Sequence, residues 1–389
     1  MYNIDFKLPE PWTSVKEFTM LVSYLNEIED PRINRRKLHP LVSILVIYLC
    51  ACICGREDWE EIVDFANIRL DFFKKLVPLP HGIPSKDTFS RVIERIHPSI
   101  LQQVTNDWRN NIFIVSNEGE QIVLDGKKLR ASRSGDENKA CYLVNAWANK
   151  KGCVIAQKRV HDKANETEAM SLIIDEIDVE NLTVSIDAIG CQRDLAMKII
   201  KKHGDYLFAL KANQQNALQI VKTYFDTLLA LDKPKDALSY FESFEKSHGR
   251  LERRECYVLP APKPLLVGEK WTGLKSVVMI ISQRTLDGKM SQEKRYYLSS
   301  LSVDAQSFAQ KIRNHWSIEN SLHWVLDVDF SEDRSRVRSG FSPQNASWMR
   351  CLALSLLKKE PSKLSIRRKI NLAIDSTDYI LKVLLSKGC

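Results

Sequence analysis

Apolar residues recur every three to four positions along the first 115 residues, which is the spacing of amphipathic helices. This pattern predicts helices over residues 18–30, 41–54 and 59–76. A fourth helix is predicted to begin after Ser85, a residue type that caps helix N-termini. The segment 41–54 is apolar throughout, yet it is too short to span a bilayer and begins too late for a signal peptide. We therefore expect a buried helix there and no membrane partner.

From Gln121 the pattern changes to short apolar runs that end in polar or glycine residues, as strands do. Strands are predicted, in chain order, over residues 121–125, 140–148, 153–160, 181–187 and 205–214. Helical periodicity separates the later strands, over residues 165–178 and 193–204. Antiparallel strands followed by strand–helix units predict an α/β fold with a mixed sheet covered by helices.

The alternation of strands and helices stops at about residue 215. Residues 215–305 contain mostly strand-like runs separated by proline-containing loops, which we interpret as a β-rich insertion. The chain is thus predicted to have two parts, a helical domain over residues 1–115 and a domain with the sheet over residues 116–389. The insertion lies within the second part.

Composition and charge add two constraints. The chain has 389 residues, and its 57 Lys and Arg exceed its 49 Asp and Glu, for a net charge of +8. This excess is compatible with a polyanionic partner. Arg35 and Arg36 lie in a basic connector that is either a contact to a DNA backbone or an ordinary solvated loop. Nine cysteines without a C-x-x-C pair argue against a disulfide framework and favour a reducing cytoplasm.

Three acids stand out by position. Asp125 and Asp187 are predicted to end two strands, and chemistry in open sheets gathers at the carboxyl ends of strands. Glu319 lies on an apolar helical stripe, three residues after Trp316 and seven before Leu326. A carboxylate on a buried face is costly unless a positive charge meets it. Either the three acids form an oxygen cage for Mg²⁺ or Mn²⁺, or Glu319 pairs with an arginine or histidine in a metal-free core.

Five motifs in order carry a resemblance over nearly the whole chain: "DGKKLRAS", "SIDAIGCQ", "LFALKANQ", "HGRLERRE" and "RNHWSIENSLHWVLDVDFSEDRSRVRSG". The chain resembles the DDE insertion-sequence transposases of the ISAs type, or H-repeat-associated proteins. The resemblance implies an RNase H-like catalytic domain in which Asp125, Asp187 and Glu319 bind Mg²⁺ or Mn²⁺. Its substrates would be double-stranded DNA, namely the terminal inverted repeats of the element and the target DNA.

The implied enzyme cuts the ends of an insertion sequence and joins the freed 3′-OH to target DNA, as a homodimer on DNA. It would be cytoplasmic and nucleoid-associated when bound. Two rival functions remain open: a metal-dependent nuclease without strand transfer, and a non-catalytic transposon-derived DNA-binding protein. The helices before residue 115 would either recognise the terminal repeats or only brace the catalytic domain.

Basic residues near the motifs are predicted to contact phosphates, which positions DNA without reading its sequence. These residues are Lys127, His248, Arg250, Arg253 and Arg254. The wider superfamily carries a Tyr and an Arg before the glutamate and a Lys after it, where this chain has Ile312, His315 and Leu326. Arg313, Asn320 and Asp327 lie on an adjacent helical face and are the candidates for those roles.

Overall fold

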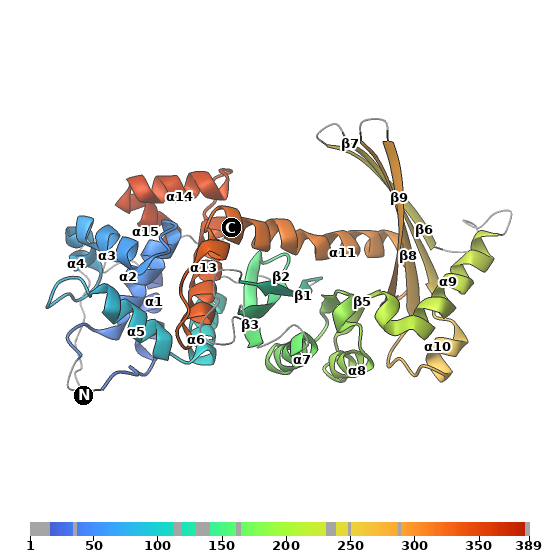
Figure 1. Ribbon diagram of the computed structural model, residues 1–389, viewed down its shortest axis with the longest axis horizontal. Coiled ribbons are helices and arrows are strands. Elements are labelled where there is room, and N and C mark those ends of the chain that lie inside the picture. The colour runs from blue at the N-terminus through green and yellow to red at the C-terminus, as the bar shows by residue number, and fades with distance from the viewer. Residues whose placement is uncertain are drawn as a thin grey trace.

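The fold is known from a computed structural model that describes residues 16–33, 37–112, 119–129, 141–160, 165–230, 239–247, 250–286 and 289–385. The chain forms an elongated body with a cluster of helices at one end and a long sheet running toward the other (Figure 1). Within the described residues, no helix is long and apolar enough to cross a membrane.

The helical cluster combines segments from both ends of the chain. Its helices are α1 (Lys16–Asn26), α2 (Leu41–Ile53), α3 (Trp59–Ile68), α4 (Leu70–Leu76), α5 (Lys86–Arg95), α6 (Pro98–Ile112), α13 (Ser342–Lys359), α14 (Ile366–Asp375) and α15 (Thr377–Leu385). The helix predicted over 59–76 is two helices, because the chain turns at Arg69. The Ser85 side chain accepts a hydrogen bond from the Thr88 backbone N–H at 3.3 Å, which confirms it as the N-cap of α5.

One mixed sheet of nine strands fills the rest of the body. The strands are β1 (Gln121–Lys128), β2 (Tyr142–Ala148), β3 (Cys153–Val160), β4 (Thr183–Ile186), β5 (Asp205–Leu210), β6 (Ser239–Ser247), β7 (Arg250–Pro260), β8 (Ser276–Leu286) and β9 (Lys289–Ser299). Their order is β3-β2-β1-β4-β5-β9-β8-β7-β6. The pairs β1–β4 and β4–β5 are parallel and all others are antiparallel. The predicted mixed α/β class is confirmed.

The β-rich insertion is continuous with the main sheet, because β9 pairs directly with β5. It also contains helices that the strand pattern did not predict, α9 (Gln215–Leu229) and α10 (Lys263–Val267). The outer half of β9 is exposed, so the insertion projects beyond the helices that cover the sheet (Figure 1).

Helices cover both faces of the sheet. On one face lie α7 (Glu166–Glu176) and α8 (Arg193–Lys201), whose apolar sides share a core with β1, β4 and β5. On the other face lies α11 (Ala305–Ile318), which crosses from the strands of the insertion toward the helical cluster (Figure 1). It continues through a π-helical turn, Glu319–His323, into α12 (Trp324–Val328).

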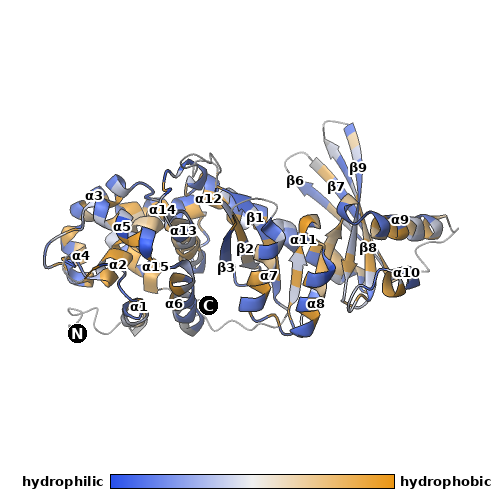
Figure 2. Cartoon of the chain, turned by 60° about the horizontal axis from the view of Figure 1, so that its bottom comes forward, coloured by the Kyte–Doolittle hydropathy of each residue, from blue (hydrophilic) through white to orange (hydrophobic). Residues whose placement is uncertain are grey.

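The helical cluster has one core to which both ends of the chain contribute. All 13 residues of α2 are buried, and α2 is mostly hydrophobic in Figure 2. It packs against α13, and the same apolar cluster includes residues of α1, α5, α6, α14 and α15. The indole N–H of Trp348 in α13 donates to Thr105 Oγ1 in α6 at 2.9 Å. The predicted boundary near residue 115 therefore marks a change in secondary structure, while the packing crosses it.

Replacing Trp348 with alanine tests this shared core. Trp348 is 1% exposed, and truncating a buried tryptophan typically costs about 3–5 kcal/mol of unfolding free energy. In urea denaturation we expect Trp348→Ala to lower the free energy of unfolding of the whole chain by that amount, in a single transition. Trp324→Ala is the control, because Trp324 is 55% exposed and should change stability by about 0.5 kcal/mol or less. Separate unfolding of the N-terminal helices in Trp348→Ala would contradict a shared core.

Candidate active site

The parallel pairing of β1 with β4 brings two of the predicted acids to the same place. Register pairs run from Gln121 with Thr183 to Leu124 with Ile186. The next residues along the two strands are Asp125 and Asp187. Asp187 follows the end of β4, as predicted. Asp125 does not end β1, because the strand continues to Lys128 by pairing with β2 on its other edge.

A set of buried polar contacts attaches α11 to these two strands. The Gln121 side-chain amide donates to Ser185 Oγ and to the Lys311 carbonyl oxygen, both at 2.9 Å. His315 Nδ1 lies 3.1 Å from the same Ser185 hydroxyl. Burial lowers the pKa of His315 to about 4, so the imidazole is neutral at physiological pH. These contacts fix the helix over the strand ends that carry Asp125 and Asp187.

The third acid lies where this helix changes its winding. Glu319 is the first residue of the five-residue π-helical turn between α11 and α12. It is exposed, and Trp316 before it is 40% exposed, which contradicts the predicted buried stripe. The buried positions are Ile318 and Leu322 instead. The prediction failed because Trp316 and Glu319 line a cavity and are not packed on an apolar core.

The three acids line a single cavity of about 340 Å³. Basic side chains also line it, namely Lys211, Lys222, Lys294 and Arg295. Burial, the neighbouring Asp187 carboxylate and then the more remote acids raise the pKa of Asp125 to about 7. Carboxylates that oppose one another's ionisation in a cleft are typical of catalytic or metal-binding sites.

Glu319 is exposed, so the alternative of a glutamate in a metal-free core is wrong, and among the described residues it forms no ion pair. The nearby histidine serves a different acid: His323 Nδ1 lies 3.5 Å from Asp125 Oδ2. Burial and the Lys127 charge lower the pKa of His323 to about 4. The contact is therefore one between a carboxyl group and a neutral imidazole.

The chemistry of the three acids fits a divalent metal ion, although the side chains are not gathered around one point. Carboxylate oxygens are the donors that Mg²⁺ and Mn²⁺ prefer, and a cation would relieve the repulsion that raises the Asp125 pKa. In the residues that the structure describes, no three His, Cys, Asp or Glu side chains form a ready-made metal cage.

A fourth acid, Glu166, lies close to the site and was not predicted. It is 4% exposed at the start of α7, and its charge contributes to the raised pKa of Asp125. Its carboxylate occupies the space into which any side chain at Gly126 would project. The glycine of the "DGKKLRAS" motif thus leaves the space that the Glu166 carboxylate fills. That motif was the only sequence signal for this contact.

Lys127 has a different role from the one predicted. Its side chain is 8% exposed, and its ammonium lies 2.6 Å from Asp327 and 2.7 Å from Glu332. This position contradicts the predicted phosphate contact, because a buried ammonium held by two carboxylates has no side left for DNA. The same ion pair engages Asp327, which was one of the candidates for a phosphate-handling role on the helix that carries Glu319.

The remaining predicted DNA contacts lie along the insertion or outside the described residues. A groove of about 960 Å³ lies between β6–β9 and α11 and shares Glu319 and Trp316 with the acidic cavity. Arg254, Arg313 and Asn320 line it. Arg35, Arg36 and His248 lie outside the described residues, as does the side chain of Arg250.

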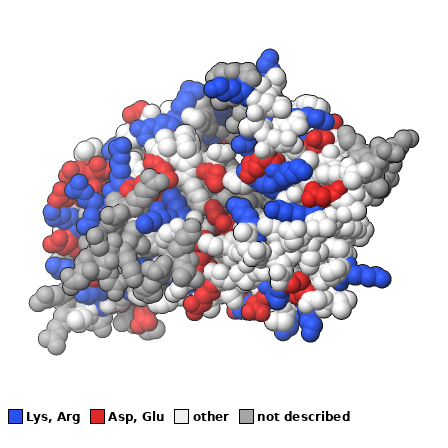
Figure 3. Space-filling view, turned by 45° about the vertical axis from the view of Figure 1, so that its right-hand side comes forward, with Lys and Arg blue, Asp and Glu red and all other residues white. Residues whose placement is uncertain are grey.

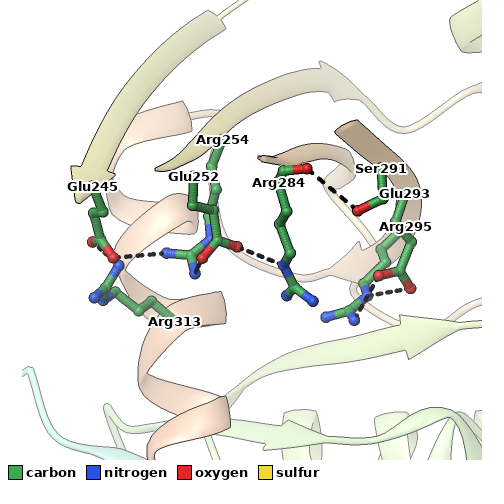
Figure 4. A network of polar contacts seen from close by, with 8 residues as sticks. All are labelled: Glu245, Glu252, Arg254, Arg284, Ser291, Glu293, Arg295 and Arg313. Carbon is green, nitrogen blue, oxygen red and sulfur yellow. Dashed lines mark hydrogen bonds and ion pairs between the residues drawn. The ribbon is translucent and has the colours of Figure 1, made fainter. Parts of the chain in front are cut away.

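Arginines of this groove are paired with glutamates (Figure 4). Arg254 lies 2.9 Å from Glu252, and Arg284 donates to the same carboxylate at 3.0 Å. Arg313 pairs with Glu245. Arg253, on the same strand as Arg254, pairs with Glu242 and lies 3.2 Å from Glu255. Basic and acidic side chains are accordingly interspersed in the space-filling view of Figure 3, without one continuous basic patch on that face.

Comparison with known proteins identifies the family of the chain. Residues 116–356 match the family described as "Transposase DDE domain", and residues 22–109 match the family described as "DDE_Tnp_1-associated". The putative transposase YncI of Escherichia coli O157:H7 is 36% identical over 372 residues, which cover 94% of each chain.

Two further comparisons extend over most of the chain. The H repeat-associated putative transposase YhhI of Escherichia coli K12 is 35% identical over 96% of this chain and 99% of its own. A piggyBac transposase synaptic complex with hairpin DNA covers 95% of this chain and 79% of its own, at 10% identity and a TM-score of 0.42, too low to assign a fold. The two family matches and the identity to YncI and YhhI show that this chain belongs to the DDE transposase family of the H-repeat-associated type.

Proposed function

We propose that this transposase cuts the ends of an insertion sequence and joins the freed 3′-OH to target DNA, using Asp125, Asp187 and Glu319. The observation that carries the proposal is that these three acids, from three separate elements, line one cavity. The raised pKa of Asp125 supports the proposal, because after burial its largest cause is the charge of Asp187, another of the three acids.

The proposed catalytic core is RNase H-like. Its support is the order β3-β2-β1-β4-β5, in which an antiparallel three-stranded unit adjoins two parallel strands. The acids lie on the central strand β1, just after its parallel neighbour β4, and on the helix that crosses the sheet.

The three carboxylates would hold divalent metal ions, Mg²⁺ or Mn²⁺. When bound, such ions activate the attacking water or hydroxyl and stabilise the leaving oxygen. The protein's own task is then placement. The backbone N–H of Ile189 donates to Asp187 at 3.1 Å and orients that carboxylate. The neutral His323 lies against Asp125 and limits its rotation.

DNA would enter along the groove that joins the cavity. Lys211, Lys222 and Lys294 line the cavity beside the acids and are suited to phosphate oxygens. Arg254, Arg313 and Asn320 would contact the strand farther along the groove. The glutamate partners of the arginines hold their side chains extended, and phosphate would compete with them for the guanidinium groups.

The helices before residue 115 would recognise the terminal repeats, and two protomers would hold the two ends. Arg91 and Arg95 are exposed on α5 and could reach a groove of DNA, while Arg35 and Arg36 would grip phosphates. Because these helices share a core with α13–α15, their binding must be measured in the full chain.

Removing one carboxylate at a time tests the triad. Asp125→Asn, Asp187→Asn and Glu319→Gln keep side-chain size but remove a ligand charge, so each should abolish strand cleavage and joining. Binding to a terminal-repeat duplex in a gel-shift assay should stay within about threefold, since DNA is positioned mainly by phosphate contacts. Asp194→Asn is the control, because Asp194 lies in α8, on the face of the sheet opposite α11. It should cleave at the wild-type rate. Cleavage at the wild-type rate by any of the three would exclude that residue.

Metal dependence should follow the preferences of oxygen ligands. Cleavage of an end duplex is expected with Mg²⁺ or Mn²⁺ and not with Ca²⁺, whose longer and looser coordination supports binding without chemistry. The same reaction with an added target duplex reports joining, which separates a transposase from a simple nuclease. Full cleavage in excess EDTA would rule out a metal mechanism.

The raised pKa of Asp125 gives a prediction for the metal-free protein. Between its usual value of 3.8 and about 7, the folded state holds more of this proton than the unfolded chain does. The free energy of unfolding therefore falls as the pH rises through that window. Asp125→Asn should raise the melting temperature in EDTA at pH 8 and have little effect at pH 4. Asp71→Asn, at a 94% exposed side chain, should not show this pH dependence. An equal gain at both pH values would contradict the shifted pKa.

A further inference from the structure

The π-helical turn that begins at Glu319 needs partners that an α-helix does not. A turn closed by i→i+5 hydrogen bonds disturbs the regular ladder and leaves a backbone carbonyl without its usual N–H donor. Such turns are often found at functional sites. Here the turn sets the direction of Glu319, because the regular helix ends at Ile318 and resumes only at Trp324.

Two lysines from different elements reach the carbonyl oxygens of this turn. Lys358, near the end of α13, donates from Nζ to the Ser321 carbonyl oxygen at 2.7 Å. Lys127 of β1 lies 3.5 Å from the His323 carbonyl oxygen. The first contact is a strong one, and the second is at the outer limit of a hydrogen bond.

Lys358 is placed where a lysine is costly. Its ammonium lies 4.4 Å from the centre of the Trp147 ring, which gives a cation–π contact with strand β2. No acid among the described residues forms an ion pair with it, and burial lowers its pKa to about 8. A surface salt bridge would not require this burial. The carbonyl of the π-helical turn is the polar group that Lys358 is positioned to bind.

Lys127 ties the same turn to the strand of the first acid. It lies two residues after Asp125, and its ammonium is held by Asp327 of α12 and by Glu332. Glu332 is in turn 3.8 Å from Arg350 of α13. The two lysines thus approach the turn from the β1 side and from the α13 side.

We propose that Lys358 and Lys127 are positioning residues that hold the π-helical turn and so direct Glu319 toward the cavity of Asp125 and Asp187. This inference rests on the proposed function, in which Glu319 is a metal ligand. Neither lysine contacts the reacting atoms. Their effect passes through the backbone of residues 321–323, as outer contacts of metal ligands commonly do.

Metal binding in the absence of DNA tests this role. Mn²⁺ is titrated into the full chain, and the rise in melting temperature gives an apparent dissociation constant. Lys358→Met should raise that constant by about 10- to 100-fold, the usual effect of losing an outer contact of a metal ligand. Lys358→Arg keeps a charged donor and should recover most of the affinity.

Lys202→Met is the matched control. Lys202 also donates to helix-end carbonyls, at 2.7 Å to Ile174 and 3.1 Å to Asp175, but it follows the end of α8, at the opposite face of the sheet. The Lys202→Met substitution should lower the melting temperature without metal and leave the apparent dissociation constant for Mn²⁺ unchanged. If Lys358→Met does not unfold cooperatively, Lys358→Gln, which is too short to reach Ser321, replaces it with the same expected loss.

The outcomes separate the two proposals. An Mn²⁺ constant in the Lys358 variants equal to that of wild type and Lys202→Met would overturn the positioning role while leaving the metal site intact. If Mn²⁺ raises the melting temperature of neither the wild type nor Glu319→Gln, the metal site itself is overturned. A loss confined to the Lys358 variants and recovered by arginine would establish the positioning role.

Discussion

Backbone hydrogen bonds between β1 and β4 hold the site together, since they decide which residues meet at the strand ends. In the observed register Asp125 and Asp187 both follow the last paired residues, Leu124 and Ile186. A slip of one residue would turn one of the two carboxylates to the other face of the sheet. The placement of α11 depends on the same register, because Gln121 of β1 and Ser185 of β4 jointly hold that helix.

The sequence pattern was sufficient to predict a structural element where neighbouring residues along the chain determine it. The short apolar run before Asp187 identified a strand and its end, and Ser85 identified a helix start. Asp125 was predicted to end the first strand, but pairing with β2 carries β1 past this residue. That pairing involves a second edge of the strand, which a one-dimensional pattern does not represent.

The failures around Glu319 and Lys127 have a different origin. A helical period shows which positions share a face, but it does not reveal that Trp316 and Glu319 border a cavity in place of an apolar core. Lys127 was predicted to contact phosphate because it is a basic residue within the "DGKKLRAS" motif. Its actual partners, Asp327 and Glu332, are about 200 residues away along the chain. Such pairings follow from the tertiary fold and leave no trace in local spacing.

The core shared by α2 and α13 has a consequence during protein synthesis. Domains generally fold as units while the chain emerges from the ribosome, with the N-terminal part first. Here α13, about 300 residues later in the chain, covers part of the apolar surface of α2, so that part remains exposed until nearly the whole chain is made. A gene copy shortened by an early stop codon would then yield a polypeptide for degradation, and not a folded fragment that competes for the ends of intact elements.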